Sequence, residues 1–222
     1  MKPFRRLGEA TAPDGSVLTL FEHDGAYVLR VNGVELMSTR HHLSEDALGH
    51  FACEPVAALP GARVLIGGLG LGFTLQAALR VLAADAHVVV AELLAEVIAW
   101  NRDPSYALAH EALADARVEV LHADVADVLR ANAGGFDAIM LDVDNGADPL
   151  TTSGNAALYR DQGIALAMHA LRPSGRLAYW SANNDRAFTR AMRRAGLLVT
   201  VTEVRARSGG GTNHAILLGQ LR

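Results

Sequence analysis

Ala62-Arg-Val-Leu-Ile-Gly-Gly-Leu-Gly-Leu-Gly72 is the stretch that decides the fold of this chain. A short apolar run ends there in closely spaced glycines, a helical pattern follows, and the acid Glu92 ends the next apolar run. This order is typical of a βαβ nucleotide-binding unit, because glycines let the backbone pass close to a ligand where a Cβ would collide. A glycine turn can also serve only the turn itself, so other residues have to support the assignment.

Acids at the ends of later apolar runs give that support. Asp124 and Asp142 each stand at or just past the end of such a run, as Glu92 does. The carboxyl ends of parallel strands share one edge of an open sheet, and ligands bind at that edge. Asp124 also fits the N-cap of a helix over residues 125–132, a role compatible with binding, and Asp142 fits a cap or a turn. We expect both to belong to a binding site.

The composition limits the classes of function. The 222 residues suit one α/β domain with a small accessory unit, and 50% are hydrophobic, enough for a large core. A net charge of −4 argues against a nucleic-acid-binding protein that relies on a basic surface. The chain has no apolar run of about 18 residues, no signal-peptide pattern, and Cys53 as its only cysteine. We expect a cytoplasmic protein with neither a membrane nor a nucleic-acid partner.

Residues 1–42 are predicted to form a small N-terminal β-hairpin unit that precedes a Rossmann-like nucleotide-binding domain over residues 43–222. Asn32-Gly33 is a strong hairpin signal, because both residues tolerate a positive φ. Such a meander is marginally stable alone, so it must pack on the main domain or on another subunit. Its exposed edge favours a homodimer. The strand patterns of this unit span residues 16–22, 26–31 and 34–37.

Beyond residue 62, strand and helix patterns alternate, which predicts a mostly parallel sheet covered on both faces. The last two strand patterns flank Ser208-Gly-Gly-Gly-Thr212 with no helix between them, so they should pair antiparallel. A parallel sheet with a C-terminal antiparallel hairpin characterises the Rossmann-like S-adenosylmethionine-dependent methyltransferase fold. We expect strands at 63–67, 87–92, 118–122, 137–142, 176–181, 198–205 and 214–219. We expect helices at 43–58, 72–83, 93–101, 105–113, 124–132, 155–171 and 185–195.

The glycine spacing indicates which nucleotide the loop holds. From Gly68 it reads G-x-G-x-G, whereas nicotinamide and flavin folds prefer G-x-G-x-x-G, and no Lys-Ser/Thr pair follows as in a P-loop. The acids fit an adenosyl ligand: Glu92 would accept from the ribose hydroxyls and Asp124 from the adenine amino group. Asp142 would lie beside the sulfonium, whose positive charge a carboxylate attracts. The expected cofactor-binding residues are Gly67, Gly68, Gly70, Glu92 and Asp124.

These motifs resemble the spermidine/spermine synthases, the polyamine aminopropyltransferases, from about residue 16 to the end of the chain. The motifs are Ile66-Gly-Gly-Leu-Gly-Leu-Gly72, Glu92, Ala123-Asp124 and Phe136-Asp-Ala-Ile-Met-Leu-Asp142-Val-Asp-Asn. Most methyltransferases carry an acid just before the glycines, where Ile66-Gly67 stands here as in the synthases. The resemblance implies decarboxylated S-adenosylmethionine as co-substrate, a small-molecule amine acceptor, and a role in polyamine biosynthesis.

By this resemblance Asp142 is the catalytic residue. It matches the first acid of the family's D-S-x-D-P loop, which assists deprotonation of the acceptor amine. An alkylammonium has a pKa of about 10.4, so its nitrogen has to lose a proton before it can attack the carbon next to sulfur. Asp144 and Asn145 would line the acceptor side, and Trp180, at the end of the fifth strand of the nucleotide domain, would form a wall.

The chain departs from the family in the half of the site that holds the aminopropyl group and the polyamine. The synthases' G-G-G-D-G-G places an acid where Gly70 stands, and the Asp-Pro of their catalytic loop falls on Asn145-Gly146. Their Tyr-His-Glu falls near Ser44-Glu45-Asp46, without the aromatic and imidazole groups. The expected function is transfer of an aminopropyl or methyl group from decarboxylated or intact S-adenosylmethionine to an amine. The alternatives are a small-molecule methyltransferase and a catalytically silent adenosyl-ligand-binding protein.

Two further classes of site have weaker support. His41-His42 and His50 lack a further ligand at helical or strand spacing, so no metal is expected. The first two histidines could instead reach the acceptor pocket, which this segment borders in the family. The serines have no G-x-S-x-G context, so a hydrolase is not expected.

Overall fold

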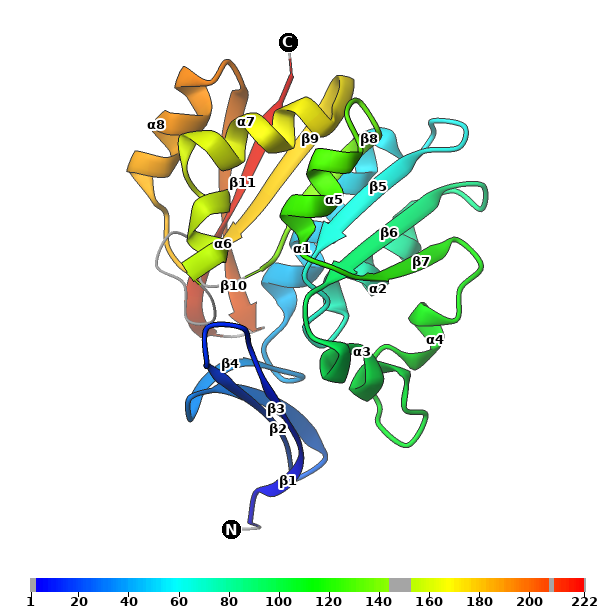
Figure 1. Ribbon diagram of the computed structural model, residues 1–222, viewed down its shortest axis with the longest axis vertical. Coiled ribbons are helices and arrows are strands. Elements are labelled where there is room, and N and C mark those ends of the chain that lie inside the picture. Colours follow the sequence, from blue (N-terminus) through cyan, green and yellow to red (C-terminus); the bar gives the residue numbers. More distant parts are fainter. Residues whose placement is uncertain (1–2, 144–152, 208–209, 222) are drawn as a thin grey trace.

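The computed structural model of the protein describes residues 3–143, 153–207 and 210–221. Within them the chain forms two β-sheets, a four-stranded sheet near the N-terminus and a seven-stranded sheet flanked by helices (Figure 1). No helix of the described ranges is long and apolar enough to span a membrane.

The N-terminal sheet is antiparallel, in the order β1-β2-β3-β4. The Asn32-Gly33 turn has φ values of 48° and 84°, as the hairpin prediction requires. The first strand was not predicted, because its residues are mostly polar and only Ala10 among them is buried. Pairing with the second strand maintains it, and Gly8 lies so close to Trp100 of the main domain that a Cβ would come within 2.4 Å of the indole nitrogen. The strands are β1 Arg5–Thr11, β2 Val17–His23, β3 Ala26–Val31 and β4 Val34–Ser38.

The main sheet has the order β10-β11-β9-β8-β5-β6-β7. Its strands are β5 Arg63–Gly67, β6 His87–Glu92, β7 Val118–His122, β8 Phe136–Leu141, β9 Leu171–Ser181, β10 Leu198–Arg207 and β11 Gly210–Gln220. The neighbours β7-β6-β5-β8-β9 pair in parallel, whereas β11 pairs antiparallel with both β9 and β10. The predicted fold class, a mostly parallel sheet with a C-terminal antiparallel hairpin, is therefore confirmed.

Helices cover both faces of this sheet (Figure 1). They are α1 Leu43–Cys53, α2 Phe73–Val81, α3 Ala95–Arg102, α4 His110–Leu113, α5 Val125–Ala131, α6 Ser153–Leu158, α7 Asp161–Ala170 and α8 Arg186–Arg194, with a 3-10 turn η1 at Glu54–Val56. The single helix predicted over 155–171 is wrong, because the chain breaks at Tyr159-Arg160 into α6 and α7. Gly163 permits this corner, since a Cβ there would come within 2.4 Å of the Leu158 backbone. The helix predicted over 105–113 is likewise reduced to its last turn, α4.

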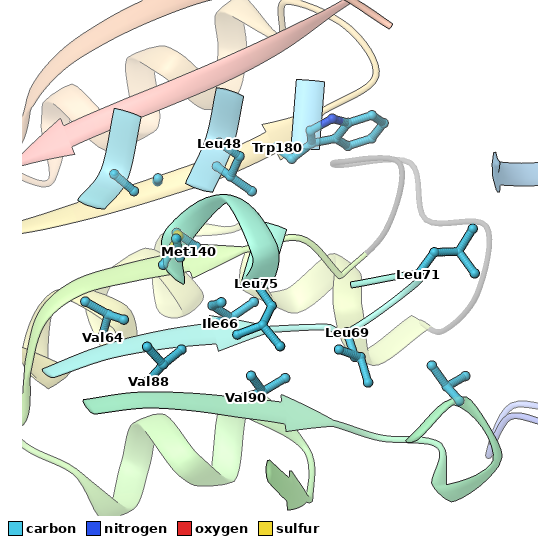
Figure 2. Close-up of a cluster of buried hydrophobic side chains, with 14 of the residues drawn as sticks. Leu48, Val64, Ile66, Leu69, Leu71, Leu75, Val88, Val90, Met140 and Trp180 are labelled. Carbon is cyan, nitrogen blue, oxygen red and sulfur yellow. The ribbon is translucent and has the colours of Figure 1, made fainter. Parts of the chain in front are cut away.

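Each face of the main sheet carries its own hydrophobic core. Along β5, Val64 and Ile66 point into one cluster and Leu65 into the other, as the period of two in a strand requires. The first cluster takes Leu48 from α1 and Leu75 from α2, shown with their neighbours in Figure 2. Residues of the N-terminal sheet join this same cluster: Ala10, Leu18, Leu20, Leu29 and Val31. The meander thus packs on the main domain, which gives it the apolar contacts that it lacks alone.

Candidate active site

A cavity of about 410 Å³ lies at the carboxyl edge of the parallel strands. The glycine loop after β5 and the ends of β6, β8 and β9 form its floor, while β2, β3 and β4 of the N-terminal sheet and the tip of the β10–β11 hairpin contribute further walls. This is the edge at which open α/β sheets bind ligands. Its polar and titratable lining residues are Glu35, Ser38, His41, Glu45, Glu92, Asp124, Asp142, Thr212 and His214.

Two of the three predicted loop glycines line the cavity. Gly68 has φ 90°, and a Cβ there would come within 2.3 Å of the Asp142 carbonyl oxygen, so glycine lets the loops after β5 and β8 touch. Gly70 has φ 53° and faces Met37. Gly67 is different, because it packs against Val125 and Leu141 and is absent from the lining of the cavity. Its lack of a side chain serves packing beneath the site.

Glu92 anchors the glycine loop. One carboxylate oxygen accepts from the Leu69 N–H at 2.8 Å and the other from the Leu94 N–H at 2.9 Å. Burial raises the pKa of the Glu92 carboxyl, and hydrogen bonds from backbone N–H groups oppose that rise. Hydrogen bonds from the backbone N–H groups of Leu93 and Gly70 also stabilise the charged form, so the carboxylate is held by the loop that it anchors.

Asp124 caps a helix and also lies in the lining of the cavity. Its side chain accepts from the Ala126 N–H at 2.8 Å and caps α5, and the residue also lines the cavity. The residue is exposed, so its carboxylate keeps acceptor capacity beyond the helix cap. A helix cap of this kind fixes the carboxylate in place for a ligand.

Asp142 lies at the end of β8 together with a second acid, Glu45 of α1, which the sequence did not assign to the site. Thr74 Oγ1 donates to an Asp142 carboxylate oxygen at 2.7 Å and lies 3.4 Å from the Glu45 carbonyl oxygen. Burial raises the pKa of both carboxyls; the negative charge of Asp142 adds to the rise at Glu45, and the Thr74 hydrogen bond opposes the rise at Asp142. Two buried carboxyl groups that interact in this way do not readily ionise at the same time, because each negative charge is unfavourable for the other. Such a pair is suited to accept a proton and hold it.

Ser44 and His214 extend this acidic pair, and neither was predicted as a site residue. Ser44 Oγ donates to a Glu45 carboxylate oxygen, and His214 Nδ1 lies 2.9 Å from the same hydroxyl. Burial lowers the pKa of the His214 imidazole, and the neighbouring His41 lowers it further. The only sequence signal was the position of Glu45 within the segment that matches Tyr-His-Glu; His214 carried none, because it is 170 residues from Ser44.

Trp180 lines the cavity at the end of β9, where the sequence predicts a wall. Its ring packs edge-on against His214, with 4.7 Å between ring centroids. Its indole nitrogen is buried and has no hydrogen-bond partner among the residues that the structure describes. Asp144 and Asn145, the other two predicted acceptor-side residues, lie outside the described residues.

The charges around the cavity have one sign. Five carboxyl groups line it, and none of its described lining residues is lysine or arginine. A cationic ligand would be attracted, whereas a ligand carboxylate would find no compensating cation. Among the described residues no group of three or more His, Cys, Asp or Glu side chains has the geometry of a metal site. Of the histidines weighed for metal, His41 lines the cavity and His42 stacks on Phe73 and pairs with Asp46.

No protein-family model and no curated protein sequence matches this chain. Many solved structures match its fold, among them two spermidine synthases and one probable spermidine synthase. A spermidine synthase from Thermotoga maritima gives a TM-score of 0.76 at 17% identity, and one in complex with the transition-state analogue AdoDATO gives 0.74 at 18%; each alignment covers 97% of this chain and 72% of that chain. A probable spermidine synthase from Corynebacterium glutamicum gives 0.67 at 16%, covering 99% of this chain and 81% of its own. The chain therefore has a spermidine synthase-like fold.

Proposed function

We propose that this protein is a spermidine synthase-like transferase that moves an aminopropyl group from decarboxylated S-adenosylmethionine to a small-molecule amine. The observation that carries the proposal is the pair of buried acids, Asp142 and Glu45, in a cavity whose opposite side holds Glu92 and Asp124. The first pair suits an amine that must lose a proton. The second pair suits an adenosine.

The charge of the cavity favours the decarboxylated donor over intact S-adenosylmethionine. The donor tail ends in an ammonium in the first case and carries a carboxylate as well in the second. With five acids and no lysine or arginine in the described lining, that carboxylate would be desolvated without a cation. Glu35 and Met37 of β4 both line the cavity, although a register shift separates them: Glu35 pairs with Arg30 of β3, whereas Met37 pairs with Leu29 and lies beside Gly70. We propose that Glu35 attracts the donor ammonium in place of the acid that Gly70 lacks.

Asp142 is proposed as the base. An acceptor amine arrives as an ammonium with a pKa of about 10.4, and a carboxylate attracts it, orients it and takes its proton as the nitrogen attacks carbon. The carbon–sulfur bond breaks, and the sulfonium becomes a neutral thioether. Asp144, Asn145 and Trp180 remain the proposed acceptor-side residues.

A methyltransferase is the second candidate, and Met37 is the observation that favours it. A Cβ built at Gly70 would lie 2.7 Å from Met37 Sδ, so this side chain occupies space beside the loop where a donor tail would extend. A shortened tail pocket does not obstruct transfer of a methyl group. A silent adenosyl-ligand binder would keep Glu92 and Asp124 but would not need Asp142.

Calorimetric titration with decarboxylated S-adenosylmethionine, S-adenosylmethionine and 5′-methylthioadenosine tests the proposal. Tighter binding of the decarboxylated donor, followed by turnover with an amine, is the expected result. Tighter binding of S-adenosylmethionine would instead favour the methyltransferase as the function of the protein. Failure of all three to bind would refute the assignment of the adenosine site.

A further inference from the structure

A continuous line of hydrogen bonds leads from the buried Glu45 carboxyl toward the rim of the cavity. Ser44 Oγ donates to Glu45, His214 Nδ1 lies 2.9 Å from Ser44 Oγ, and His214 Nε2 lies 3.2 Å from Thr212 Oγ1. Glu45 is 5% exposed, whereas Thr212 is exposed to solvent. The line therefore joins the interior of the site to water.

The direction of these bonds fixes the histidine tautomer. A hydroxyl has one proton, and that of Ser44 is donated to Glu45, so Ser44 Oγ has to accept from an Nδ1–H of His214. His214 Nε2 is then unprotonated and accepts from the Thr212 hydroxyl. Since burial holds the pKa of His214 below its ordinary value, the ring is neutral in this arrangement. A neutral imidazole can receive a proton on one nitrogen and release one from the other.

The proposed reaction requires a path by which a proton can leave the buried site. Two cations enter, the sulfonium donor and the acceptor ammonium, and a neutral thioether and one alkylated ammonium form. One proton is left over for each turnover. Asp142 receives it, and it has to leave before the next cycle because Asp142 lies in a buried site. Resting on the proposed function, we propose that Glu45, Ser44 and His214 conduct this proton from Asp142 to the rim of the cavity at Thr212.

The chemistry of each step balances. The proton passes between the two carboxyls, which share the cavity and interact electrostatically. Once Glu45 is protonated, the His214 ring first exchanges its proton from Nδ1 to Nε2 through water, which leaves Nδ1 free to accept. Glu45 then gives its proton to Ser44 Oγ as the serine proton moves to His214 Nδ1. The Nε2 proton leaves toward Thr212 and water, which restores the Nδ1–H tautomer. Ser44 and His214 are positioning residues, because neither has to touch the substrate.

Other titratable groups surround the line without joining it. His41 faces His214, and Asp46 is next to Glu45 in the chain. Asp46 is held by His42 at 2.8 Å and by Arg80 at 2.8 Å, and its negative charge adds to the rise in the pKa of Glu45. These groups modulate the proton affinity of the path, and Glu45 with His214 are its two titrating members.

Nitrogen NMR of His214 in the whole protein is the first test, and it does not depend on turnover. The expected neutral tautomer carries the proton on Nδ1, and Ser44→Ala should abolish that preference. A His214 ring without a proton on Nδ1 while Glu45 is ionised would mean that Ser44 does not link Glu45 to His214, and this result would overturn the proposal. His87, exposed at the start of β6, provides the reference resonance.

Kinetics provide the second test. Ser44→Ala and His214→Ala should lower kcat roughly 10- to 100-fold with little change in the KM for donor or acceptor. Added imidazole should restore kcat in His214→Ala and leave the unmodified enzyme unaffected, a response that a structural role does not produce. His87→Gln is the matched control. Full turnover in both variants, or loss without imidazole rescue, would overturn the path alone. Lack of donor binding in the calorimetric experiment would instead overturn the proposed function on which the path rests.

Discussion

Met37 of the N-terminal sheet lies against Gly70 of the glycine loop, so closely that a Cβ at Gly70 would stand 2.7 Å from its sulfur and 3.0 Å from its terminal methyl. The spermidine/spermine synthase motif that this loop resembles has an acid at the position of Gly70. In this chain the Met37 side chain occupies the space beside that position. Residues of β4 and of the loop after β5 together line this part of the cavity, where we propose that the donor tail binds.

Restoring the acid should require removal of Met37. The single variant Gly70→Asp is expected to bind donors weakly, because the new side chain would collide with the thioether of Met37. The backbone itself can accommodate the substitution, since aspartate tolerates a φ of 53°. The double variant Met37→Ala, Gly70→Asp should favour the decarboxylated donor over S-adenosylmethionine by about tenfold more than the unmodified protein, the effect of one charge-assisted contact. Calorimetry with both donors measures the ratio. An unchanged ratio, with Met37→Ala as control, would mean that the donor tail lies elsewhere.

Asp142→Asn should separate an enzyme from a binder. Loss of a general base typically lowers the rate by about 10²- to 10⁴-fold, and we expect this in kcat with donor affinity nearly preserved. Asp127→Asn on α5 is the control, because Asp127 is exposed and outside the cavity. Unchanged turnover in Asp142→Asn would remove Asp142 as the base.

Glu92→Gln should weaken binding of 5′-methylthioadenosine. The amide can accept through one oxygen only, so either Leu69 N–H or Leu94 N–H loses its partner, and the ribose loses a charged acceptor. A charged hydrogen bond contributes about 1.5 to 3 kcal/mol, which corresponds to roughly a 10- to 150-fold higher Kd. Glu96→Gln, an exposed residue one turn further on, should bind as the unmodified protein does. Equal affinities in the two variants would contradict the ribose assignment.

The raised carboxyl pKa values predict opposite pH trends for stability and activity. Burial raises the folded-state pKa of Glu45, Glu92 and Asp142, so at pH values between the ordinary and the raised pKa the folded chain binds more protons than the unfolded chain. The free energy of unfolding should therefore fall as pH rises through that interval, the reverse of an ion-paired carboxylate. Activity should rise over the same interval, because the base has to be ionised. Urea denaturation at about pH 5 and about pH 8 checks the sign, and Glu45→Gln should reduce the slope.

Gly68→Ala should disturb both stability and the site. The residue has φ 90°, and the added Cβ would stand 2.3 Å from the Asp142 carbonyl oxygen. Gly15 has φ 88° with no atom within 4 Å of its hypothetical Cβ, so Gly15→Ala is a control for backbone strain alone. Strain of that kind is worth about 1 to 3 kcal/mol, and Gly68→Ala should exceed the control and also reduce nucleotide affinity. Equal losses in denaturation experiments would mean that the loops after β5 and β8 do not touch.

Local patterns were sufficient for most of the architecture. Apolar runs and turn residues predicted all seven main-sheet strands, although β9 and β11 begin earlier than expected, at Leu171 and Gly210. The absence of a helix around Ser208-Gly-Gly-Gly-Thr212 predicted the antiparallel hairpin. The strand β1 was missed because a mostly polar strand held by its neighbour has no periodic signal. The two-domain division at residue 42 and the homodimer remain predictions.

Some residues of the candidate site could likewise be predicted from the sequence, and others could not. Glu92, Asp124 and Asp142 were readable from the chain because strand ends of a parallel sheet meet at one edge, whatever the details of packing. Glu45, Ser44 and Met37 belong to segments whose place depends on how α1 and β4 pack, and His214 reaches Ser44 across 170 residues. The hydrophobic periodicity of a segment indicates which of its residues are buried. Which residue each of them contacts depends on how distant helices and strands pack together. The three acids at the strand ends are therefore determined by the linear sequence, whereas the contacts that join Glu45, Ser44 and His214 exist only in the folded chain.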